Sequence, residues 1–414
     1  MVATIGVKRL AAAGWAIIAL SCAPTPPPSV QASPAGGARA GSHASSTGSD
    51  AGALAATPDA ASSASPEGPS DAGGQVLALG MPRMPLAAGR SRVAVELPAR
   101  SFVSVGVLGP GDALLGFDTA SGAELGDLHA NGAVDEDGRL PRFLSLATPA
   151  EPSSLMVLVE LDAPGELARV TVDPSALTAP LPRELKLGTA SARPLIGLPI
   201  PVDPRDGYLL EAPQRYLFLR IDVVVALRTA LRQAKTRFKR NAIAVGHASQ
   251  WDGAAPGTDR GKAQHIGHRS GLEVDLGLPA SDDSPSGTAR RCEGVLVERE
   301  VLRCAPGTVR DLDAMRLAYL LGLLIDGPTP NGIYMPKNRP GPIALVDSIL
   351  TDEAYIDEIR RAAKELRRKR WIHDEGYAAL MEDGLLRPSA WHVDHVHVRF
   401  AGEPAAPQLT PTAP

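Results

Sequence analysis

Five of the nine histidines lie in two short segments, residues 264–275 and 391–399. If the second segment is a strand, its side chains alternate, so His395 and His397 share one face while valines bury the other. Two imidazoles on one face can converge on a single point, where one ligates a metal and the other exchanges protons with bound water. By itself, a His-x-His pair on a strand is more often a chance pair of surface or core histidines than a metal site, and the spacing from His268 to Asp275 in the first segment is a weaker signal still. The two segments together favour a metal site.

The first segment supplies the other ligands. Gly271 permits a turn, after which Leu272 to Asp275 alternates apolar and acidic residues, as a strand would. Asp275 should then face away from the core, with His268 approaching from the preceding loop. His268, Asp275 and His397 offer two nitrogens and one carboxylate oxygen. This set leaves the fourth tetrahedral position open for water, as in catalytic zinc sites.

The arrangement of these residues resembles that of a known superfamily. His268-x-x-Gly271-x-x-x-Asp275, followed far downstream by His395-x-His397, is similar to the signature of the lysostaphin, D-Ala-D-Ala peptidase and hedgehog zinc proteins. Within that superfamily the chain looks most like the penicillin-insensitive murein endopeptidases. The family's histidine three residues before its first ligand and its histidine five residues before its last ligand both have counterparts here.

Those counterparts are His265 and His392, and the resemblance covers roughly residues 206–402. The resemblance implies three zinc ligands, His268, Asp275 and His397. It implies that His392 and His395 polarise the water, protonate the leaving amine or stabilise the oxyanion. The reaction would be hydrolysis of the D-alanyl–meso-diaminopimelyl cross-link of peptidoglycan by metal-activated water, without a serine nucleophile.

Two positions depart from the family pattern. The family has a second metal half-site, for which this chain offers no later Asp-x-x-His. His265 therefore either supports a metal ligand without binding the metal, contacts the substrate, binds a second metal, or has no role in the site. Glu273 stands where the family prefers Asp, so it either orients a histidine or faces solvent.

Other functions remain open at this stage. A D,D- or L,D-carboxypeptidase would trim free stem peptides, but a D-Ala-D-Ala dipeptidase usually has Glu where Asp394 stands. A zinc-stabilised envelope binding protein is another reading, although it would need neither His392 nor His395. The function could also lie in the N-terminal region, where the sequence offers no motif.

The chain begins like an exported protein. Lys8 and Arg9 precede a short apolar run that ends at Cys22, which resembles a bacterial lipoprotein signal in residues 1–22. Ordinary secretion or an uncleaved anchor is the alternative. The resulting prediction is a periplasmic lipoprotein that touches the membrane only through its lipid. Residues 23–75, rich in Ala, Pro, Ser and Gly, should be a disordered linker.

Cysteine use and charge limit the alternatives further. Apart from Cys22, only Cys292 and Cys304 are present, and in an oxidising compartment they should form a disulfide rather than bind a metal. The net charge of −4 makes nucleic acid a poor partner.

The elements that position these residues can be predicted only coarsely. Short apolar runs between turns predict a small all-β, sandwich-like domain over residues 76–185. Residues 206–402 mix helical and strand periodicities, which favours an α+β zinc peptidase domain with a small antiparallel sheet and flanking helices. The expected helices are 221–239, 311–325 and 353–370, the last opened by Thr351. The basic face of the first helix is expected to be a solvated surface; a surface that binds a polymer is the alternative. Residues 403–414 should be a disordered tail.

Overall fold

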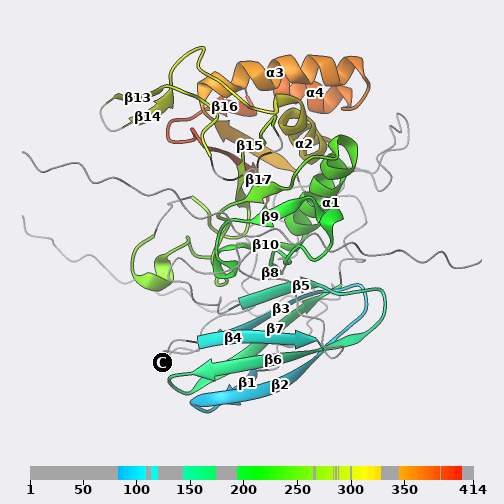
Figure 1. Ribbon diagram of the computed structural model, residues 1–414, viewed down its shortest axis with the longest axis vertical. Helices are drawn as coiled ribbons and strands as arrows, with labels where there is room; N and C mark the ends of the chain where they lie inside the picture. Colours follow the sequence, from blue (N-terminus) through cyan, green and yellow to red (C-terminus); the bar gives the residue numbers. More distant parts are fainter. Residues whose placement is uncertain are drawn as a thin grey trace, which may run out of the picture. The chain divides into compact units, whose positions relative to one another are not determined.

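The computed structural model describes residues 83–108, 113–119, 143–173 and 194–402, with internal gaps at 264–266, 283, 285–286, 288, 299–300, 328–344 and 383. Cys22, His265, the predicted linker and the predicted C-terminal tail lie outside the described residues. The described residues all belong to one compact unit of mixed α+β structure (Figure 1), as the sequence predicts.

The first part of this unit contains only strands among its described residues. They are β1 (Arg83–Leu86), β2 (Gly89–Leu97), β3 (Phe102–Leu108), β4 (Ala113–Thr119), β5 (Phe143–Ala147), β6 (Ser153–Leu161) and β7 (Gly165–Val172). They form two antiparallel sheets, in the orders β1-β7-β3-β5 and β2-β6-β4. Every residue of β3 is buried, as its nearly continuous apolar sequence favours, and Ser104 within it is satisfied by a 2.8 Å hydrogen bond to Ser145.

The second part combines strands with helices. Its strands are β8 (Leu195–Gly197), β9 (Tyr208–Leu210), β10 (Phe218–Arg220), β11 (Ile243–Val245), β12 (Glu273–Gly277), β13 (Val295–Glu298), β14 (Val301–Cys304), β15 (Val346–Thr351), β16 (Leu386–Pro388) and β17 (His395–Phe400). Its α-helices are α1 (Ile221–Phe238), α2 (Ala314–Asp326), α3 (Glu353–Arg368) and α4 (Asp374–Met381).

The main sheet of this part has six strands in the order β16-β15-β17-β12-β11-β9. Its centre is antiparallel, but β15 pairs with β16 and β11 with β9 in parallel. The prediction of an antiparallel sheet therefore holds only for the centre. Parallel neighbours need a crossover connection. The crossover from β9 to β11 includes α1, and the crossover from β15 to β16 contains α3 and α4.

Helix boundaries follow local signals, with one correction. The predicted apolar face of α1 is buried, including Val223, Leu227 and Leu231. Asp352, not Thr351, caps α3, because the Asp352 carboxylate accepts a hydrogen bond of 3.0 Å from the Ala354 amide. The short helix α4 was not predicted. Asp326 fixes its first turn by accepting the His373 and Gly376 amides at 3.0 and 2.7 Å.

The strands of the first part contact the second part through buried groups. Gln214 accepts the Ser145 amide at 3.0 Å and donates to the Leu198 carbonyl at 3.1 Å. Phe143 packs edge-on against Phe218, with ring centroids 5.4 Å apart. These contacts join β5 to the segment that leads into α1.

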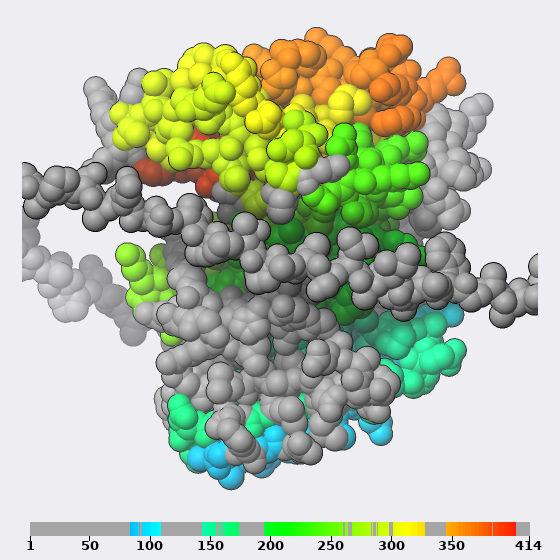
Figure 2. Space-filling model, in the orientation of Figure 1, coloured from blue at the N-terminus to red at the C-terminus, as the bar shows by residue number. Residues whose placement is uncertain are grey.

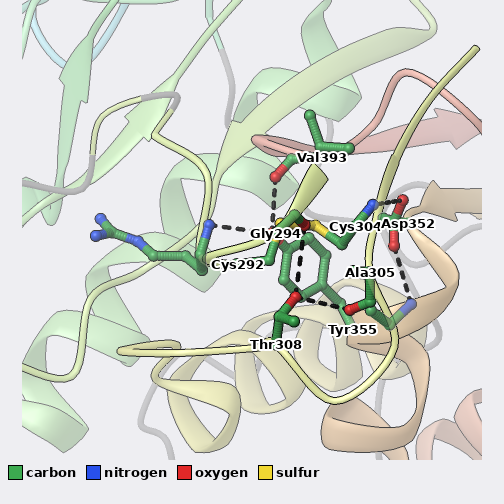
Figure 3. The surroundings of a disulfide bond; sticks show 10 residues. Cys292, Gly294, Cys304, Ala305, Thr308, Asp352, Tyr355 and Val393 are labelled. Carbon is green, nitrogen blue, oxygen red and sulfur yellow. Dashed lines mark hydrogen bonds between the residues drawn. A yellow bond between two sulfur atoms is a disulfide. The ribbon is translucent and has the colours of Figure 1, made fainter. Parts of the chain in front are cut away.

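A disulfide joins Cys292 to Cys304, as predicted, with the two Cα atoms 5.9 Å apart (Figure 3). It closes the base of the β13–β14 hairpin onto the segment before it. Cys304 is buried, and its amide donates a 3.0 Å hydrogen bond to Asp352 at the start of α3. None of the described helices is long and apolar enough to cross a membrane.

Removing this disulfide should destabilise the fold. The paired Cys292→Ala and Cys304→Ala variant is expected to lose about 3 kcal/mol of unfolding free energy, because an open loop of this length gains entropy mainly in the unfolded chain. Denaturant unfolding with and without reductant measures this loss. Reductant should weaken the natural chain and leave the double variant unchanged; equal stability of both proteins would contradict the prediction.

Candidate metal centre

The pairing of β12 with β17 brings the two histidine-containing segments together. In this antiparallel register Asp275 lies opposite His397, and Glu273 lies opposite Arg399. Because side chains alternate along each strand, these four residues share one face of the sheet. Val274 and Val398, on the other face, are fully buried in the core. The predicted alternation in both strands is confirmed.

His268 reaches this face from the loop before β12, through a turn that requires glycine. Gly271 has φ +71°, and a Cβ there would lie 2.6 Å from the Arg220 amide nitrogen and 2.4 Å from a Leu195 methyl group. The Arg220 amide donates to the Gly271 carbonyl at 2.9 Å, which ties the turn to the start of α1. A side chain at this position would displace the loop that carries His268.

Asp275 lies between the two histidines predicted to share a ligand set with it. Its carboxylate oxygens are 3.1 Å from His268 Nε2 and 3.1 Å from His397 Nδ1. Its side chain faces away from the apolar core, but it is not exposed: the residue is only 4% accessible. Burial alone would raise the pKa of Asp275, but the charge of His268 and the hydrogen bonds to His268 and His397 hold this pKa well below its usual value.

His397 has a carboxylate on each ring nitrogen. Its Nδ1 faces Asp275, and its Nε2 lies 3.5 Å from Glu273 Oε2. Burial lowers the pKa of His397, but the carboxylates of Asp275 and Glu273, one at each ring nitrogen, outweigh burial and raise the pKa to about 9. Glu273 is only 13% exposed at its side chain, so the alternative that it faces solvent is wrong.

Glu273 was not predicted as a metal ligand, but the structure places it among the possible ligands. His268, Glu273 and His397 each offer a ligand atom within 4.8 Å of the others, so these three residues could hold a metal ion. Glu273 Oε2 is buried, and its contact with His397 Nε2, at 3.5 Å, is too long for a good hydrogen bond. A buried carboxylate oxygen bonded so weakly, beside two imidazoles, is the kind of donor that a divalent metal satisfies. The strand alternation could have revealed it, since Glu273 and Asp275 are two residues apart.

His392 and His395 lie against the same centre. Their rings are 4.8 Å apart, and the His392 ring is 5.9 Å from that of His397. His395 Nδ1 lies 2.7 Å from Asp394 Oδ1, and His392 Nδ1 lies 2.8 Å from the Ala390 carbonyl. A carboxylate and a carbonyl only accept, so in the neutral rings Nδ1 carries the proton and Nε2 is the acceptor.

The two rings differ in how readily they take a second proton. Burial lowers the pKa of His392, and the neighbouring imidazoles lower it further. Burial also lowers the pKa of His395, but the hydrogen bond to Asp394 and the charge of Asp275 outweigh it, so that its pKa is raised. The neutral form is thus favoured at His392 and the protonated form at His395.

These side chains line an open cavity of about 370 Å³. Its walls are Gly267, His268, Glu273, Ser348, Leu350, Trp391, His392, His395, His397 and Arg399. Trp391 is a second residue that sequence reasoning missed as part of the site. Nothing in its local sequence marks it, apart from its place beside His392.

Comparison with known proteins adds no assignment. No model of a known protein family matches the chain, and no curated protein is similar to it. The chemistry of the site must therefore be argued from its own residues.

Two carboxylates compete for the role of metal ligand, and a pair of isosteric variants separates them. If Asp275 is the ligand, Asp275→Asn should weaken zinc binding by at least 100-fold, since an amide oxygen is a much poorer ligand than a carboxylate. Glu273→Gln should weaken it by about tenfold, as expected when a group that only orients a ligating histidine is altered. Equilibrium dialysis with metal analysis measures both. The reverse order would make Glu273 the ligand.

Proposed function

We propose that this protein is a zinc-dependent peptidoglycan hydrolase that cleaves the D-alanyl–meso-diaminopimelyl cross-link. One observation carries the proposal: His268 and His397, both in contact with the buried Asp275, line the same cavity as two further histidines, each with one ring nitrogen bonded to an acceptor. A purely structural metal site has its coordination closed by protein ligands and needs no such neighbours.

The proposed ligands are His268, Asp275 and His397. Asp275 contacts each imidazole with a different oxygen, Oδ2 at 3.1 Å from His268 Nε2 and Oδ1 at 3.1 Å from His397 Nδ1, so its carboxylate lies close enough to both nitrogens to share a zinc ion with them. Glu273 would then hold His397 from the other side, through Nε2. This is the usual outer carboxylate of a metal-bound histidine, which fixes the ring's orientation. Zinc, when bound, would supply Lewis acidity and lower the pKa of a water molecule.

The neighbouring histidines would handle protons. Because Nδ1 of His395 is engaged by Asp394, its Nε2, which lies 3.6 Å from Asp275 Oδ1, is the atom that would accept or donate a proton. Nδ1 of His392 is engaged by the Ala390 carbonyl, so its Nε2 would act in the same way. The two rings lie side by side, so one can receive the proton of the attacking water while the other delivers one to the leaving amine. Amide cleavage needs both transfers.

The substrate follows from the resemblance to the murein endopeptidases, and the site supports its general class. A peptide amide needs the metal, a base and an acid at one place, and the cavity is open enough for a chain to enter. Export as a periplasmic lipoprotein, also proposed, would bring the site to its substrate. Trimming of stem peptides by a carboxypeptidase is the alternative that uses the same residues.

The test is cleavage of cross-linked muropeptides by the full-length protein, followed by mass spectrometry. Dimers should become monomers, and a zinc chelator should stop the reaction. His268→Ala and His397→Ala should lose both zinc and activity. His395→Ala should keep zinc and lose about 10²–10⁴-fold in rate, the usual contribution of general acid–base catalysis.

His373→Ala is the matched control, because this histidine lies at the start of α4 and outside the cavity. It should retain both zinc and rate. Release of terminal D-alanine without dimer cleavage would show that the protein is a carboxypeptidase and not an endopeptidase. Zinc binding without any product would show that it is a binding protein and not a hydrolase.

A further inference from the structure

Trp391 combines two unfavourable features at the edge of the cavity. It is 57% exposed, unlike most large apolar side chains of the described residues. Its φ is +71°, a left-handed conformation that is costly for any residue with a large side chain. Strained residues of this kind persist only where the surrounding structure enforces them, and they concentrate at functional sites.

The surroundings that enforce this conformation are backbone hydrogen bonds on both sides of Trp391. Its own amide donates to the Leu302 carbonyl of β14 at 3.0 Å, and the His392 carbonyl accepts the Asp352 amide at 3.2 Å. The Tyr355 hydroxyl donates to the Val393 carbonyl at 2.7 Å (Figure 3). The backbone from residue 391 to 393 is thus fixed by the hairpin and by the start of α3.

The hairpin is itself anchored at this place. The Cys292–Cys304 disulfide lies at its base. The Tyr355 hydroxyl lies 3.2 Å from Cys304 Sγ and accepts the Arg291 amide at 3.0 Å. In Figure 2 the red C-terminal part of the described chain is visible in a recess beneath the yellow segment that contains the hairpin. The fold thus holds the Trp391 backbone firmly and leaves its ring in solvent.

The hairpin that holds the Trp391 backbone also has exposed apolar residues. Val297, which pairs with Leu302, is 69% exposed, and Leu296 beside it is 43% exposed. At Arg399, another lining residue, the charge is balanced by Glu273 and Asp347, at 3.7 and 3.6 Å. The exposed indole of Trp391 and the balanced charge of Arg399 favour contact with an uncharged, aliphatic part of a ligand over capture of a charged group.

We propose that Trp391 is a substrate-contact residue, whose indole face packs against the uncharged backbone and methyl groups of the stem peptide beside the scissile bond. This proposal rests on the proposed function, since it takes the peptide cross-link as the ligand. An indole ring supplies a large, rigid contact area at a low cost in side-chain entropy. The disulfide-bonded hairpin holds the loop backbone that carries this ring, and thus helps to position the ring for substrate binding.

The experiment compares three substitutions that separate contact from fold. Trp391→Ala and Trp391→Gly both remove the ring, but only glycine adopts the left-handed conformation without strain. Trp391→Phe keeps an aromatic face. Each is made in the full-length, zinc-loaded His395→Ala protein, so that cross-linked muropeptide dimers bind without being consumed. Calorimetry gives the dissociation constant, and thermal unfolding gives the stability.

Both the Ala and the Gly variants should bind the dimers at least tenfold more weakly, with zinc content unchanged, whereas Phe should stay within about threefold, as expected for loss or retention of an aromatic platform. The Gly variant should nevertheless unfold a few degrees above the Ala variant, because it relieves the strain. Weak binding that does not follow stability distinguishes a contact residue from a structural one. Wild-type-like binding by the Ala variant would overturn the proposal.

The outcome is separable from that of the proposed function. If the natural chain binds the dimers through Trp391 but yields no product, the contact stands and the hydrolase fails. If Trp391→Ala in the otherwise natural chain cleaves dimers with an unchanged KM, the contact is overturned and the hydrolase stands. If the natural chain neither binds nor cleaves the dimers, both are overturned.

Discussion

The buried carboxylate of Asp275 is the constraint on which the architecture of the site depends. A carboxylate with 4% exposure loses its hydration, and this costs several kcal/mol unless opposite charge and hydrogen bonds replace it. Here the replacement comes from His268, seven residues earlier, and from His397, 122 residues later in the chain. The sheet register and the Gly271 turn must therefore both be correct, because an error in either would leave the charge without a partner.

The same logic extends outward from Asp275. The other ring nitrogen of His397 lies 3.5 Å from the Glu273 carboxylate, and Glu273 in turn lies 3.7 Å from Arg399 at the cavity wall. In the metal-free protein, the raised pKa of His397 and the lowered pKa of Asp275 describe one interaction from its two sides. A metal at this centre would take the place of the protons on the imidazoles, so metal binding and proton release are coupled.

The parts of this structure that follow from local sequence were predictable. Alternation identified the face of β17 that carries His395 and His397, and apolar periodicity located α1 within one residue at its C-terminus. Features that depend on long-range pairing were not predictable. The register that sets Glu273 opposite Arg399, the parallel edges of the sheet, and the backbone conformation of Trp391 all arise from contacts between distant segments. Local patterns carry no information about such contacts, so the sequence revealed which residues could form the centre but not which carboxylate lies where.

The disulfide connects stability with the placement of functional groups. His392 and Trp391 lie in a loop that belongs to no sheet, and their backbone is held by β14, Asp352 and Tyr355. Two of these three supports also contact Cys304. Loss of the disulfide would therefore act first on the loop beside the metal centre, before it acts on the six-stranded sheet, because the hairpin has no other covalent anchor near its base. A disulfide at this position persists in an oxidising environment, so the order of this loop is tied to the redox state of Cys292 and Cys304.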